Sequence, residues 1–141
     1  MNPHFLPDTW RVIQTAYDPS DQRFAESLMS LGNGAMGLRG NFEEDYSGDS
    51  LKGTYIGGVW FPDKTRVGWW KNGYPQYFGK VINAMDLIGL SVRVDGQVLD
   101  AARMEVRSFY RELDMRSGLL RREMALQAEG GKVRIRAERF V

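Results

Sequence analysis

The chain has 141 residues, a formal net charge of +1 and no cysteine. The near-neutral charge argues against a nucleic-acid or membrane-surface role driven by bulk charge, and the lack of cysteine excludes disulfides and thiol catalysis. No basic, apolar leader opens the sequence, and its most apolar stretch, residues 81–92, is interrupted by Asn83 and Asp86. We therefore expect a cytoplasmic protein without a secretory signal or membrane span.

The first third of the chain has a period of two and several turn signals. Residues 9–17 and 24–31 are predicted as strands, with a turn at residues 18–21, where Pro and Asp favour chain reversal. A third strand is predicted at residues 36–42, after a turn at Asn33-Gly34. Asn-Gly is the strongest short hairpin signal, because both turn positions must accept positive φ.

The middle of the chain combines one strand with an irregular insertion. Residues 55–60 are predicted as a strand, and Gly57-Gly58 inside it indicates a bulge or a close backbone approach. Residues 61–77 hold two Pro, two Gly and the aromatic residues Trp69, Trp70, Tyr74 and Tyr77, without a clear period. A loop this long is usually functional or part of an interface.

The last third is predicted to be built of hairpins. Strands are expected at residues 90–94 and 97–99, joined by Asp95-Gly96, and then at 105–113, 119–127 and 132–140. Residues 100–107 form one helical turn at most. Lys132, Arg134 and Arg136 alternate with apolar residues, which is typical of the solvated face of a half-buried strand. The fold class is therefore all-β, an antiparallel β-sandwich with few or no helices.

Residues 32–37 match the G-x-G-x-x-G pattern of dinucleotide sites. That chemistry needs a strand, then glycines against a pyrophosphate, then a helix whose N-terminus holds the anion. Here another glycine, Gly40, follows and the downstream pattern is that of a strand. We interpret the motif as a glycine-rich β-turn and predict no cofactor-binding residue and no cofactor.

Neither the acidic cluster nor the single histidine indicates a catalytic or metal site. Glu43, Glu44 and Asp45 are adjacent, so they cannot straddle a glycosidic bond as a pair, and we expect a solvated loop. His4 is the only histidine and lies in a Pro-rich end, where we expect an exposed terminal residue. The sequence predicts no catalytic residue and no metal ligand.

Four aromatic side chains form the candidate binding surface: Trp60, Trp69, Trp70 and Tyr74. Trp and Tyr rings stack on the apolar faces of pyranose rings, so these residues could face a sugar. The same residue types are enriched at protein interfaces. The sequence leaves both alternatives open.

The segment Glu26-Ser27-Leu28-Met29-Ser30-Leu31-Gly32-Asn33-Gly34-Ala35-Met36-Gly37-Leu38-Arg39-Gly40-Asn41-Phe42-Glu43-Glu44 resembles the opening signature of glycoside hydrolase family 65. The segments 53–59, 111–118 and 139–141 extend the similarity over nearly the whole chain from about residue 10. The insertion at residues 60–75 is most similar to the maltose phosphorylases of that family, with kojibiose and trehalose phosphorylases as relatives.

The resemblance implies a galactose-mutarotase-like β-supersandwich, of which residues 1–141 would be an incomplete N-terminal part, with the catalytic (α/α)6 barrel absent from this chain. In family members a barrel Glu protonates the glycosidic oxygen while phosphate attacks with inversion, so maltose gives β-glucose 1-phosphate and glucose. No cofactor is needed, and members often form homodimers.

Three hypotheses for function follow, and we rank them in this order. The first is a non-catalytic scaffold domain whose partner is the missing barrel, so that the chain alone is inactive. The second is an oligomerisation module that forms a homodimer, and the third is a free-standing carbohydrate-binding module. Disaccharide and phosphate would be bound only through the parent enzyme.

Overall fold

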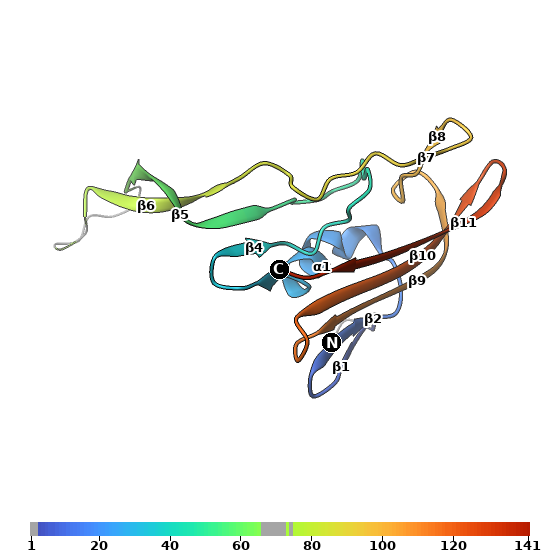
Figure 1. Cartoon of the computed structure of the whole chain (residues 1–141), viewed down its shortest axis with the longest axis horizontal. Helices are drawn as coiled ribbons and strands as arrows, with labels where there is room; N and C mark the ends of the chain where they lie inside the picture. The colour runs from blue at the N-terminus through green and yellow to red at the C-terminus, as the bar shows by residue number, and fades with distance from the viewer. Residues whose placement is uncertain (1–2, 66–72, 74) are drawn as a thin grey trace.

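The computed structural model describes residues 3–65, 73 and 75–141, and antiparallel β-sheet dominates it (Figure 1). The strands are β1 (Phe5–Pro7), β2 (Arg11–Gln14), β3 (Leu31–Gly32), β4 (Met36–Leu38), β5 (Thr54–Lys64), β6 (Tyr77–Asn83), β7 (Arg93–Val94), β8 (Gln97–Val98), β9 (Glu105–Asp114), β10 (Leu119–Ala128) and β11 (Gly131–Arg139). One short helix, α1 (Gln22–Leu28), follows a 3-10 turn, η1 (Pro19–Asp21). The predicted all-β antiparallel fold class is confirmed.

The strands form a five-stranded sheet in the order β1-β2-β9-β10-β11, a four-stranded sheet in the order β3-β4-β5-β6, and a small hairpin of β7 and β8. The three C-terminal strands pair along their full length, so that Met124 on β10 lies between Phe109 on β9 and Ile135 on β11. Lys132 and Arg134 point to solvent from β11, as their alternation predicts.

The prediction of a strand at residues 24–31 is wrong, because α1 and the residues after it occupy this segment. Ala25 and Met29 lie one helical turn apart and are both fully buried against Leu113 and Leu120 of the large sheet. A spacing of four is the helical period, and Pro at the start of η1 is a helix-start signal. The apolar residues of this segment therefore follow the spacing of a helix with one buried side, and not the alternation of a strand.

The prediction of an irregular insertion at residues 61–77 is partly wrong. Strand β5 continues to Lys64 and β6 begins at Tyr77, so the described ends of the insertion form a ladder. The predicted bulge is confirmed, since the register shifts between Tyr55 and Trp60 and Gly58 has φ 79°. Pro62 is tolerated in β5 because β4 pairs only with its first residues, which leaves the outer edge open.

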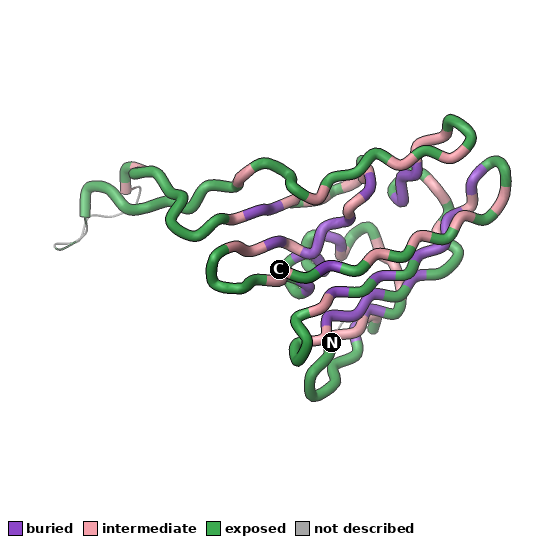
Figure 2. Tube along the Cα trace, in the orientation of Figure 1, coloured by how far each residue is buried: buried purple, intermediate pink, exposed green. Residues whose placement is uncertain are grey.

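The core lies on one face of the five-stranded sheet, whereas the β5–β6 hairpin lies outside it. Buried segments gather on the large sheet, on α1 and on the chain that follows β4, while β6 and most of β5 are exposed (Figure 2). One cluster of buried residues joins the sheet to α1, and a second joins it to the segments around Phe42 and Leu99. Figure 1 shows the hairpin projecting away from this body.

Candidate functional site

The prediction of a solvated loop at Glu43–Asp45 is wrong for the two glutamates. Glu44 is only 2% exposed, and its carboxylate accepts two hydrogen bonds from the guanidinium of Arg122 on β10. Glu43 accepts from Arg122 Nη2 at 2.8 Å and from Arg139 Nε on β11 at 3.0 Å. The carboxylates therefore neutralise two buried cations and are not free to act on a substrate.

A third buried arginine, Arg111 on β9, completes what we call the arginine cluster: Arg111, Arg122, Arg139, Glu43 and Glu44. The side-chain oxygen of Gln14 accepts from Arg111 Nη2 at 2.6 Å and from Nε at 3.0 Å, and the Gly40 carbonyl accepts from Nη1 at 2.7 Å. The Arg111 guanidinium also lies 5.5 Å from the centroid of the Phe42 ring. Each cation is thus held by oxygen acceptors or an aromatic face, as burial requires.

The electrostatics of the cluster favour fixed charges. Burial, together with the positive charge of Arg122, lowers the pKa of Arg111 to about 9. Burial opposes the ionisation of Glu43, but the charges of Arg122 and Arg139 outweigh it and hold the pKa of this carboxyl below its ordinary value. Burial likewise opposes the charge of Arg122, and the two glutamates outweigh it and raise its pKa. These shifts keep Glu43, Arg111 and Arg122 charged at neutral pH.

The arginine cluster was not predicted from the sequence, although the alternation of residues along β9 and β10 indicated it. Arg111 lies two residues from Phe109 and from Leu113, and Arg122 lies two residues from Leu120 and Met124. With a period of two, both arginines fall on the buried face of their strands. Charged residues at inward positions, with an acidic pair elsewhere in the chain, indicate a buried ionic cluster.

The glycine-rich motif at residues 32–37 forms the β3–β4 hairpin, as the β-turn interpretation expects. The Asn33 side chain accepts from the backbone N–H groups of Ala35 and Met36, at 2.9 and 3.0 Å. Gly37 lies inside β4, which pairs with β5, so no helix N-terminus faces the glycines. The geometry matches a turn and not a phosphate cradle.

His4 is half-buried, with Nε2 lying 3.9 Å from an oxygen of Asp18, so it is less exposed than the sequence suggested. Within residues 3–65, 73 and 75–141, no three His, Asp or Glu side chains gather in a way that could hold a metal ion. None of the described helices is long and apolar enough to cross a membrane.

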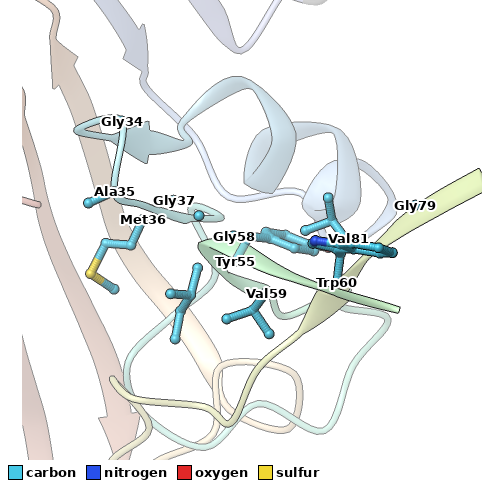
Figure 3. A pocket seen from close by; sticks show the side chains of 12 residues that line it. Gly34, Ala35, Met36, Gly37, Tyr55, Gly58, Val59, Trp60, Gly79 and Val81 are labelled. Atoms are coloured by element: carbon cyan, nitrogen blue, oxygen red, sulfur yellow. The ribbon is translucent and has the colours of Figure 1, made fainter. Parts of the chain in front are cut away.

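A hollow of about 600 Å³ lies where the β3–β4 turn meets the bulge of β5. Its lining is mostly apolar, with polar surface from the backbone and from Tyr55 and Trp60: Gly34, Ala35, Met36, Gly37, Tyr55, Ile56, Gly57, Gly58, Val59, Trp60, Gly79 and Val81. Figure 3 shows the Trp60 ring beside Val81 at one side of this hollow, with glycine backbone between the side chains. Of the predicted surface, Trp60 lines the hollow, while Trp69, Trp70 and Tyr74 lie outside the described residues.

Exposed apolar side chains lie along the β5–β6 hairpin around this hollow, and the register of the ladder divides them between its two faces. Trp60 is 58% exposed, and neighbouring apolar residues of both strands are exposed by similar fractions. The exposed set is Ile56, Val59, Trp60, Phe61, Tyr77, Phe78, Val81 and Ile82. Groups of neighbouring exposed apolar side chains are typical of interaction surfaces. Trp60 was predicted as part of this surface and its aliphatic members were not: Val81 and Ile82 begin the apolar stretch 81–92, and Ile56 and Val59 lie in the predicted strand 55–60.

Comparison with known proteins agrees with this geometry. Residues 12–141 match the model of the glycosyl hydrolase family 65 N-terminal domain. The chain is 55% identical to a maltose phosphorylase of Bacillus subtilis over 97% of its own length and 18% of that protein. It is 29% identical to a kojibiose phosphorylase of Thermoanaerobacter brockii, over 95% of this chain and 16% of that protein.

A solved structure supports the same assignment. The chain superimposes on a putative kojibiose phosphorylase from the human microbiome with a TM-score of 0.83 at 27% identity, over 96% of this chain and 18% of that one. The chain thus spans less than a fifth of the length of these relatives. It belongs to the N-terminal domain of glycosyl hydrolase family 65.

Proposed function

We propose that this chain is the front part of a non-catalytic N-terminal domain of an inverting disaccharide phosphorylase that works in the cytoplasm. The parent would convert maltose and phosphate to β-glucose 1-phosphate and glucose. The domain would bind the (α/α)6 barrel that carries the chemistry and would provide an interface. The choice of maltose rests on the 55% identity to a maltose phosphorylase over nearly the whole chain.

The observation that carries the non-catalytic role is the arginine cluster. Inverting cleavage needs a carboxylic acid that can reach the glycosidic oxygen from an open site. Glu43 and Glu44 instead lie under the sheet and accept hydrogen bonds from Arg122 and Arg139. Both charges are already used within the fold, whereas the exposed apolar side chains of the hairpin are available to a partner.

An assay of the purified chain with maltose and phosphate tests this proposal. We expect no glucose 1-phosphate above the background without protein. The chain should also restore phosphorolysis, or bind, when it is mixed with the remaining portion of a maltose phosphorylase prepared separately. Release of glucose 1-phosphate by the chain alone at rates typical of enzymes, about 1 s⁻¹ or more, would refute the proposal.

A sugar-binding role is the second candidate, because Trp60 presents an exposed ring beside a hollow. Maltose titration followed by Trp fluorescence tests it, since a stacked sugar would alter the emission of Trp60. The variant Trp60→Ala should remove such a response, whereas Trp10→Ala, a change at another exposed Trp, should retain it. If the Trp fluorescence does not change at tens of millimolar maltose, any binding is weaker than about 3 kcal/mol and this role is excluded.

A further inference from the structure

The turn between β3 and β4 contains an asparagine followed directly by a glycine, Asn33-Gly34, and both residues are exposed. The side-chain amide of an asparagine can be attacked by the backbone nitrogen of the next residue, which closes a cyclic imide and releases ammonia. Asparagine is for this reason one of the thermolabile residues of proteins. A following glycine favours the attack, because it has no side chain to hinder the nitrogen and leaves the backbone free to rotate.

The backbone nitrogen of Gly34 is accessible for this reaction. Within the described residues, the Gly34 N–H makes no hydrogen bond. A Cβ atom built at this position would meet no atom within 4 Å, so the space around the turn is open to water. The nitrogen can therefore lose its proton to solvent and act as a nucleophile.

The side-chain amide of Asn33 is held in a position that assists attack on its carbon. Its Oδ1 accepts from the N–H of Ala35 at 2.9 Å and from the N–H of Met36 at 3.0 Å. This oxygen takes the negative charge when the Gly34 nitrogen adds to Cγ. Two backbone donors at these distances have the arrangement of an oxyanion hole. Hydrogen bonds to an ionised acceptor are roughly twice as strong as those to a neutral one, so both bonds strengthen as the charge develops.

Asn83, at the end of β6, lacks these features and is the comparison within the chain. Its Oδ1 accepts from the Thr54 N–H at 2.9 Å, and its Nδ2 donates to the Lys52 carbonyl at 2.9 Å. The N–H of the following residue, Ala84, donates to the Thr54 carbonyl at 2.7 Å, so this nitrogen is not available for attack. Asn41 is buried, which keeps from it the water that must remove the proton.

We propose that Asn33 is a site of spontaneous deamidation in the folded chain and that the β3–β4 turn assists the reaction. The Gly34 nitrogen gives its proton to water and forms a bond to Asn33 Cγ. The bond from Cγ to Nδ2 then breaks, and the amide nitrogen gains a proton from water and leaves as ammonia. One water molecule opens the imide, at the side-chain carbonyl to give aspartate or at the backbone carbonyl to give isoaspartate. No other reactant is consumed.

The two products have different effects on the hairpin. Aspartate keeps an oxygen that accepts from the Ala35 and Met36 N–H groups, so the turn is retained. Isoaspartate carries the main chain through the side-chain carbons, which lengthens the turn and disturbs the pairing of β3 with β4. Gly34 and Ala35 line the hollow (Figure 3), so either product places a negative charge beside a mostly apolar lining.

Peptide mass spectrometry of the whole chain, incubated in mildly alkaline buffer, tests the proposal. Trypsin releases residues 24–39 as a peptide whose only side-chain amide is Asn33, and residues 81–93 as a peptide whose only side-chain amide is Asn83. We expect Asn33 to deamidate about tenfold faster in the folded chain than in a synthetic peptide of residues 24–39, which corresponds to a barrier lower by about 1.4 kcal/mol. Asn83 should remain unchanged over the same period.

Two substitutions at Ala35 separate assistance by the turn from simple exposure. Ala35→Pro removes one of the two N–H donors and should bring the rate in the folded chain close to that of the peptide. Ala35→Val keeps the donor and should retain the faster rate. The same substitutions in the synthetic peptide correct for their local chemical effect, and circular dichroism melts show whether each variant is folded.

Three results would overturn the proposal. The first is a rate at Asn33 in the folded chain that equals or falls below the rate in the peptide, and this comparison decides even if Ala35→Pro does not fold. The second is deamidation of Asn83 as fast as that of Asn33. The third is a loss of rate in folded Ala35→Pro no larger than the same substitution causes in the peptide.

Discussion

Neighbouring arginines on one strand have opposite roles in this domain. Arg122 is buried on the inner face of β10, where it binds Glu43 and Glu44 and its guanidinium lies 4.4 Å from the centroid of the Phe42 ring. Arg121, one residue earlier, lies half-exposed on the outer face beside Glu138. The pleat of the strand alone separates them, because successive side chains point to opposite faces.

The free energy of unfolding should therefore respond very differently to the same change at these two positions. Arg122→Met leaves the buried Glu44 carboxylate without its cation, while Glu43 keeps Arg139, and should cost about 3–5 kcal/mol. Arg121→Met breaks the exposed pair with Glu138 and a 3.9 Å contact with Glu112, which keeps Arg11 and Tyr110 as partners, and should cost no more than about 1 kcal/mol. Urea unfolding followed by circular dichroism measures both. Equal losses would mean that Arg122 is not confined in a buried ionic cluster.

At Gly40, which belongs to the family signature, the packing leaves no room for a Cβ atom. A Cβ at this position would lie 2.6 Å from the Cβ of Met29 and 2.8 Å from its carbonyl oxygen, at the end of α1. The Gly40 N–H also donates to the Glu26 carbonyl at 2.8 Å. The chain can therefore pass this close to the helix only with glycine here.

Gly40→Ala should destabilise the domain by about 1–3 kcal/mol, because the added methyl group forces the helix end and the 39–41 segment apart. Gly37→Ala is the control, since a Cβ there would lie 3.6 Å from its nearest neighbour, an ordinary contact. Thermal denaturation of both variants gives the comparison. A Gly40→Ala melting temperature equal to that of Gly37→Ala would contradict this packing.

At the scale of elements, α1 acts as an anchor for a loop as well as a cover for the sheet. Glu26, fully buried in the helix, accepts from Ser50 Oγ at 2.5 Å and from the Leu51 N–H at 2.7 Å. Arg23, one helical turn earlier, reaches the same loop through Asp49, but both of these side chains are exposed. Glu26 and Arg23 thus both connect α1 to the loop at residues 49–51, and they differ mainly in that the Glu26 contact is buried and the Arg23 contact is exposed.

Glu26→Ala should release the loop before β5 and raise the hydrogen-exchange rate of the Leu51 amide, because this amide loses its acceptor. Arg23→Ala removes only the exposed pair and should change that rate little. Hydrogen–deuterium exchange with mass spectrometry on peptides covering residues 47–53 follows both. Unchanged protection in Glu26→Ala would show that the loop is held by other contacts.

At the scale of the whole molecule, the arginine cluster joins parts of the chain that are far apart in sequence. Arg139 at the end of β11 donates to the carbonyls of Arg39 and Asn41 at 2.7 and 2.6 Å and binds Glu43. The C-terminal strands are thereby tied to the segment that leads from the β3–β4 hairpin. The stability of the domain should therefore depend on the charge of this cluster.

Acid should weaken this connection in a defined pH range. The pKa of Glu43 is lowered in the folded chain, so its contribution is complete above the ordinary glutamate pKa of about 4.3 and is lost as pH falls through the lower folded value. Glu43→Gln should thus be less stable than the wild type at pH 7, and the gap should narrow towards about pH 3. Urea unfolding at both pH values measures it.

Glu123→Gln is the control for this pH dependence, because Glu123 pairs with Arg136 on the exposed face of the same sheet. Its difference from the wild type should be small at pH 7, as for other exposed pairs. If the gap between the wild type and Glu43→Gln is the same at both pH values, the ionised form of Glu43 does not carry the stabilisation.

Local sequence determined much of this fold. The period of two and the turns at Asn33-Gly34 and Asp95-Gly96 predicted the antiparallel strands, since they depend only on residues next to one another in the chain. The solvated side of β11 followed from the same alternation. The family signature added the expectation of a family 65 N-terminal domain, which the family match and the structural neighbour confirm.

Tertiary structure decided the rest, because burial and pairing depend on residues distant in sequence. Residues 24–31 have an ambiguous local pattern, and packing of Ala25 and Met29 on the large sheet selected a helix. Glu43 and Glu44 look like a solvated acidic loop until Arg122 and Arg139, about 80 to 100 positions later, meet them. The two faces of the β5–β6 hairpin likewise emerge only from its register, which no single strand contains.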